Sequence, residues 1–166
     1  MNAGWLGLGS SRKAVGRLLM ASGMALASSL ARAGDNTVTL DEVRCVIAGA
    51  AQPVPASTAE SGAASVSFVV PFHCTNLRAE PVVAFEPPAL SLLDAAGHEY
   101  PADAAATRLH VNATKLDSRG GAPLAAGATF SSADVFLLPP AAVASGPWQL
   151  QLKTPNRVIK LPLKLD

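Results

Sequence analysis

Four side chains that can bind a metal ion lie close together around one turn of the sequence. Asp94, His98, Glu99 and Asp103 supply carboxylate and imidazole groups, which are ligands for zinc and copper. Two interpretations are open. Either the four converge on a metal ion, or Asp94 and Gly97 shape a turn while the other side chains are solvated. We favour the second interpretation, because Asp and Gly are typical turn residues.

A second set of possible metal ligands combines thiolate and imidazole groups. It consists of Cys45, His73, Cys74 and His110. Side chains of a β-strand alternate between its two faces, so His73 and Cys74 are expected to point in opposite directions. The set also lacks CxxC or HxxxH spacing. We therefore expect no metal and no other cofactor here.

The serines offer little support for nucleophilic catalysis. No GxSxG elbow is present, and Ser57, Ser61, Ser131 and Ser132 have no histidine near them in the sequence. A glycine-containing segment at 118–121 does not lead from a strand into a helix, as a phosphate loop would. We expect the protein not to be an enzyme, although a triad of residues distant in sequence stays open.

The two cysteines predict a disulfide bond. Cys74 is in phase with Phe68, Val70 and Phe72, and Cys45 is in phase with its own apolar neighbours, so both are expected to face the core. A simple hairpin centred after Ala48 would place Cys74 opposite a residue near Val38. We therefore expect a bridge either between opposite sheets or across a bulge at 41–42. Two buried free thiols and an intermolecular bridge are the alternatives.

Recognition of a protein partner would need exposed edges and loops. The candidates are Phe85, which lies between acidic residues and prolines, Trp148, and the loop 48–63, which is rich in Ala and Pro. Trp148 is in phase with Leu150 and Leu152, so the core is its alternative location.

The elements that would position these residues are short strands separated by Gly, Pro and small polar residues. The pattern predicts about eight strands, drawn from nine short segments: 37–47, 65–75, 81–86, 89–94, 98–100, 107–112, 129–138, 148–153 and 157–165. Pro162 would place the last strand at a sheet edge. Only 102–106 and 140–144 are expected to form short helical turns. This pattern is typical of an all-β, antiparallel β-sandwich in a single domain covering residues 34–166.

The N-terminus has the features of an export signal. A basic stretch precedes the apolar run from Leu18 to Leu30, and Ala31 and Ala33 mark a cleavage site, so residues 1–33 are expected to be a cleaved signal peptide. Cleavage would leave nine basic residues against twelve acidic ones, a formal net charge of −3. It would also remove all three methionines, and with them any thioether copper site. A weakly acidic domain without a basic run is a poor candidate for binding nucleic acid, and the apolar run is too short to span a membrane.

Several turns and strand ends resemble a known group of bacterial domains. The segments 92–103, 124–129 and 134–139 are similar to those of the immunoglobulin-like domain of unknown function found on bacterial lipoproteins and secreted proteins. That group also resembles a secreted immunoprotective antigen. Gly127, Phe136 and Pro139 match its motif, whereas Cys45 and Cys74 depart from it. The resemblance implies an extracytoplasmic, immunoglobulin-like sandwich with no catalytic residues to carry over.

These observations together predict a non-catalytic binding or accessory module. We expect it to be periplasmic or secreted and to recognise an envelope or extracellular protein through sandwich edges and loops. A periplasmic copper- or zinc-binding accessory protein is the alternative.

Overall fold

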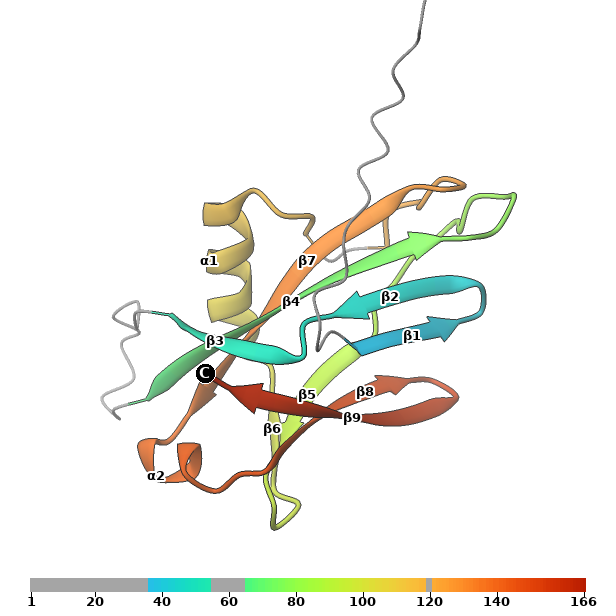
Figure 1. The fold of residues 1–166 in the computed structure, drawn as a ribbon. Coiled ribbons are helices and arrows are strands. Elements are labelled where there is room, and N and C mark those ends of the chain that lie inside the picture. The colour runs from blue at the N-terminus through green and yellow to red at the C-terminus, as the bar shows by residue number, and fades with distance from the viewer. Residues whose placement is uncertain (1–35, 55–64, 119–120) are drawn as a thin grey trace, which may run out of the picture.

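The computed structural model describes residues 36–54, 65–118 and 121–166, so the expected signal peptide lies outside the described residues. The described chain folds into nine strands and two helices (Figure 1). In chain order they are β1 (Asn36–Leu40), β2 (Val43–Ile47), β3 (Ala50–Val54), β4 (Val66–Asn76), β5 (Ala89–Leu93), β6 (Glu99–Pro101), α1 (Ala104–Thr114), β7 (Thr129–Leu138), α2 (Pro140–Val143), β8 (Trp148–Thr154) and β9 (Arg157–Leu165).

The strands form two layers. In the first layer β1, β2, β4 and β7 are neighbours in that order, and in the second β6, β5, β8 and β9 follow one another, all antiparallel. β3 joins the layers, because Gln52–Val54 pair with β4 while Ala50 and Ala51 pair in parallel with the end of β9. The protein is therefore an all-β sandwich, as the spacing of short strands predicts.

The main core fills the space between the layers. Along β4, Phe68, Val70, Phe72 and Cys74 alternate with residues of the outer face and are all buried. The second layer contributes, among others, Leu92, Leu150 and Leu152, none of which has measurable exposure. These are the inward rows expected from the period-two pattern.

Helix α1 replaces a predicted strand. The β-branched Thr107 and Val111 suggested a strand at 107–112, but they are spaced four residues apart and are the two buried residues of the helix. Asp103 begins the helix, since its side chain accepts a hydrogen bond from the N–H of Ala106 at 2.8 Å. The prediction of a strand here is wrong, and the expected helical turn at 102–106 is the start of a longer helix.

α1 packs on the outer face of the first layer (Figure 1). It covers a small second core formed by Val69, Ala133 and Val135. It also covers the edge of β7, because the N–H of Asp103 donates to the Val135 carbonyl at 2.8 Å and the Val135 N–H donates to Thr107 Oγ1 at 2.9 Å. This edge of the sheet is therefore not available to another strand at Val135.

Three other predicted elements differ from the structure. Asp41 and Glu42 form a two-residue turn between β1 and β2, with φ of 46° and 62°, and not a bulge within one strand. Strand β3 occupies part of the loop expected at 48–63, of which residues 55–63 lie outside the described part. The segment 81–86 is not a strand, since only an isolated bridge joins Val82 to Leu124.

The prediction that β9 lies at an edge holds for most of its length. β8 pairs with β9 from Arg157 to Leu163, whereas β3 reaches only Lys164 and Leu165 on the other side. Pro162, which has no N–H to donate, lies outside the segment that β3 covers.

Candidate functional site

The candidate metal ligands around the turn after β5 have separate structural partners. Asp94 Oδ1 accepts hydrogen bonds from the N–H groups of Ala96 and His98, at 2.9 and 2.8 Å. Its Oδ2 lies 2.8 Å from His98 Nδ1 and accepts a longer bond, 3.4 Å, from the Tyr100 hydroxyl. Burial raises the pKa of the Asp94 carboxyl, but these bonds outweigh it and hold the pKa below its usual value. Asp94 thus organises the β5–β6 turn.

The other two candidates, Glu99 and Asp103, have structural roles that do not involve Asp94. Glu99 forms an ion pair with Lys153 of β8, whose hydrogen bond lowers the pKa of Glu99. Asp103 caps α1. In the described residues, no group of three or more His, Cys, Asp or Glu side chains is arranged to hold a metal ion. The structure does not bring Asp94, His98, Glu99 and Asp103 together as a ligand set.

Cys45 and Cys74 form a disulfide bond, as predicted. The predicted geometry is wrong, however, because the bridge joins neighbouring strands of one layer and needs no bulge. β3 lies within the connection from β2 to β4, so that connection is not a tight hairpin and does not set the register. Cys45 lies opposite Cys74 of β4 on one side and opposite Val38 of β1 on the other. Val38 is therefore the neighbour of Cys45 and not of Cys74.

The bridge lies at a position where the two strands exchange no backbone hydrogen bonds. The Leu77 N–H donates to the Glu42 carbonyl, and the Ala48 N–H donates to the Pro71 carbonyl. Bonded pairs alternate with non-bonded pairs between these two points, which places Cys45 and Cys74 in a non-bonded pair. In such pairs the side chains are closest, and this explains why a disulfide fits between adjacent strands.

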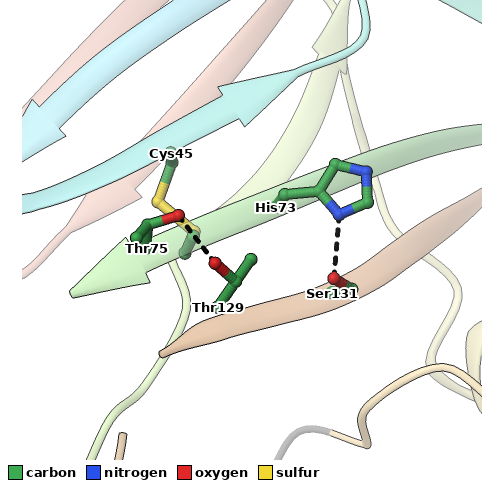
Figure 2. The surroundings of a disulfide bond; sticks show 6 residues. Cys45, His73, Thr75, Thr129 and Ser131 are labelled. Carbon is green, nitrogen blue, oxygen red and sulfur yellow. Dashed lines mark hydrogen bonds between the residues drawn. A yellow bond between two sulfur atoms is a disulfide. The ribbon is translucent and has the colours of Figure 1, made fainter. Parts of the chain in front are cut away.

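The outer face opposite this bridge is polar (Figure 2). His73 Nδ1 lies 2.9 Å from Ser131 Oγ, and the hydroxyls of Thr75 and Thr129 are 2.9 Å apart. His73 and Cys74 point to opposite faces, as predicted, and the fold brings His73, which is 58 residues away in sequence, next to Ser131. The pair is not arranged as a triad, because the Asp117 carboxylate accepts a hydrogen bond from the Ser131 N–H at 2.7 Å and not from the imidazole.

Both aromatic residues proposed for partner binding are buried. Phe85 packs edge-on against Phe130, with ring centroids 5.4 Å apart. The ring centroids of Trp148 and Tyr100 are 5.6 Å apart, and Trp148 Nε1 donates to the Val143 carbonyl at 3.4 Å. Trp148 thus occupies the core location that its phase indicates, and neither side chain projects from the surface.

Three connections lie at one end of the sandwich (Figure 1, right). They are the β1–β2 turn, the segment 77–88 between β4 and β5, and the β8–β9 turn. Two hollows of about 460 and 260 Å³ share Leu40, Asp41, Thr154 and Pro155. We call this combined feature the end groove; it is lined by Leu40, Asp41, Val43, Cys45, Arg78, Val82, Ala84, Phe85, Glu86, Pro87, Pro88, Ala89, Lys153, Thr154, Pro155, Asn156 and Arg157.

Aliphatic side chains are exposed around the end groove. Among the described residues the exposed large hydrophobic side chains are Leu77, Val83, Leu109 and Val158. Three of these four lie at this end: Leu77 and Val83 on the 77–88 segment, and Val158 beside the β8–β9 turn. Val83 is the most exposed of them, at 80%. Isolated exposed aliphatic residues are common, but a group beside a groove is typical of an interaction surface.

Asn76 positions two of the segments near the groove. It is completely buried, and its Nδ2 donates to the carbonyls of Glu80, Leu124 and Ala125 at 2.9, 3.0 and 3.2 Å. Its Oδ1 accepts a hydrogen bond from the Arg78 N–H at 2.9 Å. The sequence analysis missed this residue, because an asparagine at a strand end has the same appearance as an ordinary turn residue.

Another hollow, of about 470 Å³, lies between α1 and β5. Its walls include Leu90, Val111 and the buried Asp134, and Thr107, which is already bonded to Val135. Of the exposed large aliphatic residues of the described chain, only Leu109 is next in sequence to a residue that lines this hollow, whereas three are next to residues that line the end groove. The end groove is therefore the better candidate for recognising a protein.

Comparison with known proteins gives a fold but no family. No family model and no curated protein matches the chain. A conserved hypothetical protein from Bacillus anthracis is similar in structure, with 17% identity, a TM-score of 0.51, and coverage of 80% of this chain and 99% of that one. The fold is shared. A functionally unknown protein from Listeria monocytogenes EGD-e is similar at 11% identity and a TM-score of 0.52, over 79% of this chain and 82% of that one.

MPT63, a secreted protein from Mycobacterium tuberculosis, is more distantly similar. It has 13% identity, a TM-score of 0.46, and coverage of 78% of this chain and 91% of that one.

Within the described part of the chain, neither helix has the length and apolar character that crossing a membrane requires.

Proposed function

We propose that the protein is a non-catalytic, extracytoplasmic binding module that recognises a protein partner through the end groove. The observation that carries this proposal is that Leu77, Val83 and Val158 are exposed and that each is next in sequence to a residue lining the groove. Protein interfaces combine an apolar centre with a polar rim. The groove has this composition, since apolar residues such as Val82 and Phe85 lie beside charged residues such as Arg78 and Lys153.

The rim of the end groove is already partly ordered. Arg78 Nε donates to the Asp41 carbonyl at 3.0 Å and lies 3.9 Å from the Glu42 carboxylate, so it links the 77–88 segment to the β1–β2 turn. The Leu77 N–H bond to Glu42 strengthens the same link. A surface that is ordered before binding loses less conformational entropy when a partner docks.

The chemistry-bearing side chains favour a role without catalysis. Asp94, Glu99 and Asp103 each support a turn, an ion pair or a helix end. Among the described residues, the carboxylate next to the His73–Ser131 pair, that of Asp117, accepts from the Ser131 N–H and does not orient the imidazole as in a hydrolytic triad. These residues are accounted for by structure alone.

Two observations support an extracytoplasmic location. The Cys45–Cys74 bond is of a kind that persists in oxidising compartments. The sequence of residues 1–33 has the pattern of a signal peptide.

We further propose that the domain belongs to the bacterial immunoglobulin-like group, because Gly127, Phe136 and Pro139 match its motif. Gly127 lies at a turn with positive φ, Phe136 lies in the core, and Pro139 comes directly after β7.

Affinity capture from the native cell envelope with matched variants tests the proposal. Val83→Asp places a charge next to the groove-lining residues Val82 and Ala84, and Leu109→Asp places the same charge at an exposed position of α1, away from the groove. We expect wild type and Leu109→Asp to retain the same partner and Val83→Asp to lose it. Equal capture by all three proteins would contradict the assignment of the end groove.

A further inference from the structure

Strand β1 exposes part of its backbone at the edge of the first layer. Leu40 and Val43 flank the two-residue turn and form a bonded pair, so bonded pairs recur at Val38 with Cys45. The intervening residue Thr39 therefore directs its N–H and carbonyl away from β2. Among the described residues, no strand pairs with β1 on this outer side.

The other long edges are protected in ways that β1 is not. Asp103, Thr107 and Asp117 hydrogen-bond to the outer edge of β7. β9 carries Pro162 and lysines, which disfavour pairing with another strand. The five residues of β1, NTVTL, include neither a charge nor a proline. β1 is thus the edge best suited to pairing with an added strand.

A seam runs between the edges of β1 and β9. One end is closed, because Asn36 Nδ2 donates to the Pro162 carbonyl at 3.0 Å. Away from this contact the core is less well covered: Leu163 is 5% exposed, whereas Leu40, Ile159 and Leu161 are only partly buried. The seam then leads into the smaller hollow of the end groove, between Leu40 and the β8–β9 turn.

We propose that this seam binds an extended segment of the partner protein that carries apolar residues at alternate positions. The segment pairs with the outward N–H and carbonyl of Thr39 and extends the first layer by one strand. Its inward side chains cover Leu40, Ile159 and Leu161, and its end lies in the end groove. Alternation is required because successive side chains of a strand point to opposite faces, and only one face meets the exposed core.

This inference rests on the proposed function and makes it more specific. The end groove could recognise a partner by loops alone, without strand pairing. The occupant of the seam is assigned as an extended polypeptide because the Thr39 backbone groups are complementary to another strand, and the adjacent apolar side chains are complementary to its alternate residues.

Selection from a library of random seven-residue peptides, with the purified protein as bait, tests the inference. We expect enriched peptides with apolar residues at alternate positions. Thr39→Pro removes the outward N–H without removing a bond to β2, and Thr39→Ser retains it. Binding should weaken about tenfold or more in Thr39→Pro and be unchanged in Thr39→Ser, because the lost donor leaves a partner carbonyl unsatisfied.

Amide hydrogen exchange provides a second readout that does not depend on a variant. The Thr39 N–H should exchange slowly when a selected peptide is bound and rapidly when it is not. Enrichment without alternation, equal affinity for the Thr39 variants, or unchanged exchange at Thr39 would overturn the inference. If Val83→Asp weakened peptide binding and Thr39→Pro did not, strand pairing would be refuted and the proposed function would stand. If neither substitution changed peptide binding, both the strand pairing and the proposed function would be refuted.

Discussion

Cys45 of β2 and Cys74 of β4 lie directly opposite each other on adjacent antiparallel strands, with Cα atoms 4.0 Å apart and their sulfurs bonded. Both side chains are buried in the main core. A slip of one residue between β2 and β4 would move Cys45 to the outer face and break this pairing. The bond therefore fixes the register between β4 and the β1–β2 hairpin.

Removal of the disulfide should lower the free energy of unfolding substantially. The cysteines are separated by 29 residues in the sequence, and closure of such a loop in the unfolded chain contributes about 3 to 4 kcal/mol. We expect the double variant Cys45→Ala, Cys74→Ala to unfold at markedly lower urea concentration. A thiol count of zero on unfolded, unreduced wild type is the control, and an unchanged urea midpoint would contradict the prediction.

Replacement of Asn76 by alanine should destabilise the protein and loosen the end groove. The substitution removes the side-chain donor to the carbonyls of Glu80, Leu124 and Ala125, although the last two keep the backbone N–H groups of Val82 and Ala128 as donors. It also leaves the Arg78 N–H without its acceptor, and the loss of these hydrogen bonds costs about 1 to 3 kcal/mol. Urea unfolding measures the loss, and hydrogen exchange at Arg78 and Glu80 measures the loosening. Asn112→Ala, on the exposed face of α1, is the matched control and should be close to neutral. Similar losses in both variants would refute the role of Asn76.

Thr107 should stabilise the junction between α1 and β7 through its hydroxyl. Thr107→Val keeps the shape of the side chain but removes the acceptor for the Val135 N–H, at a cost of about 1 to 3 kcal/mol. Thr107→Ser retains the hydroxyl and should lose less stability. If thermal or urea unfolding ranks the two variants in the opposite order, the hydrogen bond is not the stabilising feature.

The β5–β6 turn should give stability an acid-sensitive component. The pKa of Asp94 is lower in the folded protein than its ordinary value of 3.8, so the folded state favours the ionised carboxylate. Its contribution is fully present above that ordinary value and is lost as the pH falls through the lower, folded pKa. Wild type should therefore exceed Asp94→Asn in urea midpoint at neutral pH, and the difference should shrink in acid. A constant difference across this range would contradict the assignment.

The alternation of apolar and polar residues predicted the strands that bury only one of their two faces. The strands at 148–153 and 157–165 were recognisable because Leu150 and Leu152, or Leu161 and Leu163, alternate with polar residues. Helix α1 was not, because only Thr107 and Val111 are buried and both are β-branched, so local propensity favoured a strand. The Asp41–Glu42 turn lacks the Gly or Asn that usually marks positive φ.

The candidate site was harder to predict than the fold. Leu77 and Val83 come from the segment 77–88 and Val158 from the start of β9. The sequence alone does not distinguish an exposed aliphatic residue from a buried one. Phe85 was the reverse case, since a residue flanked by acids and prolines is buried against Phe130. Only the packing of the two layers places the three connections at one end.

Photocrosslinking in living cells tests the central claim most directly. A photoreactive amino acid replaces Val83 at the end groove or, as the matched control, Leu109 on α1, and both exposed positions tolerate a bulky side chain. We predict that Val83 gives a discrete crosslinked protein adduct outside the cytoplasm and that Leu109 does not. An adduct of the same protein from Leu109 alone, or none from Val83, would contradict recognition through the end groove.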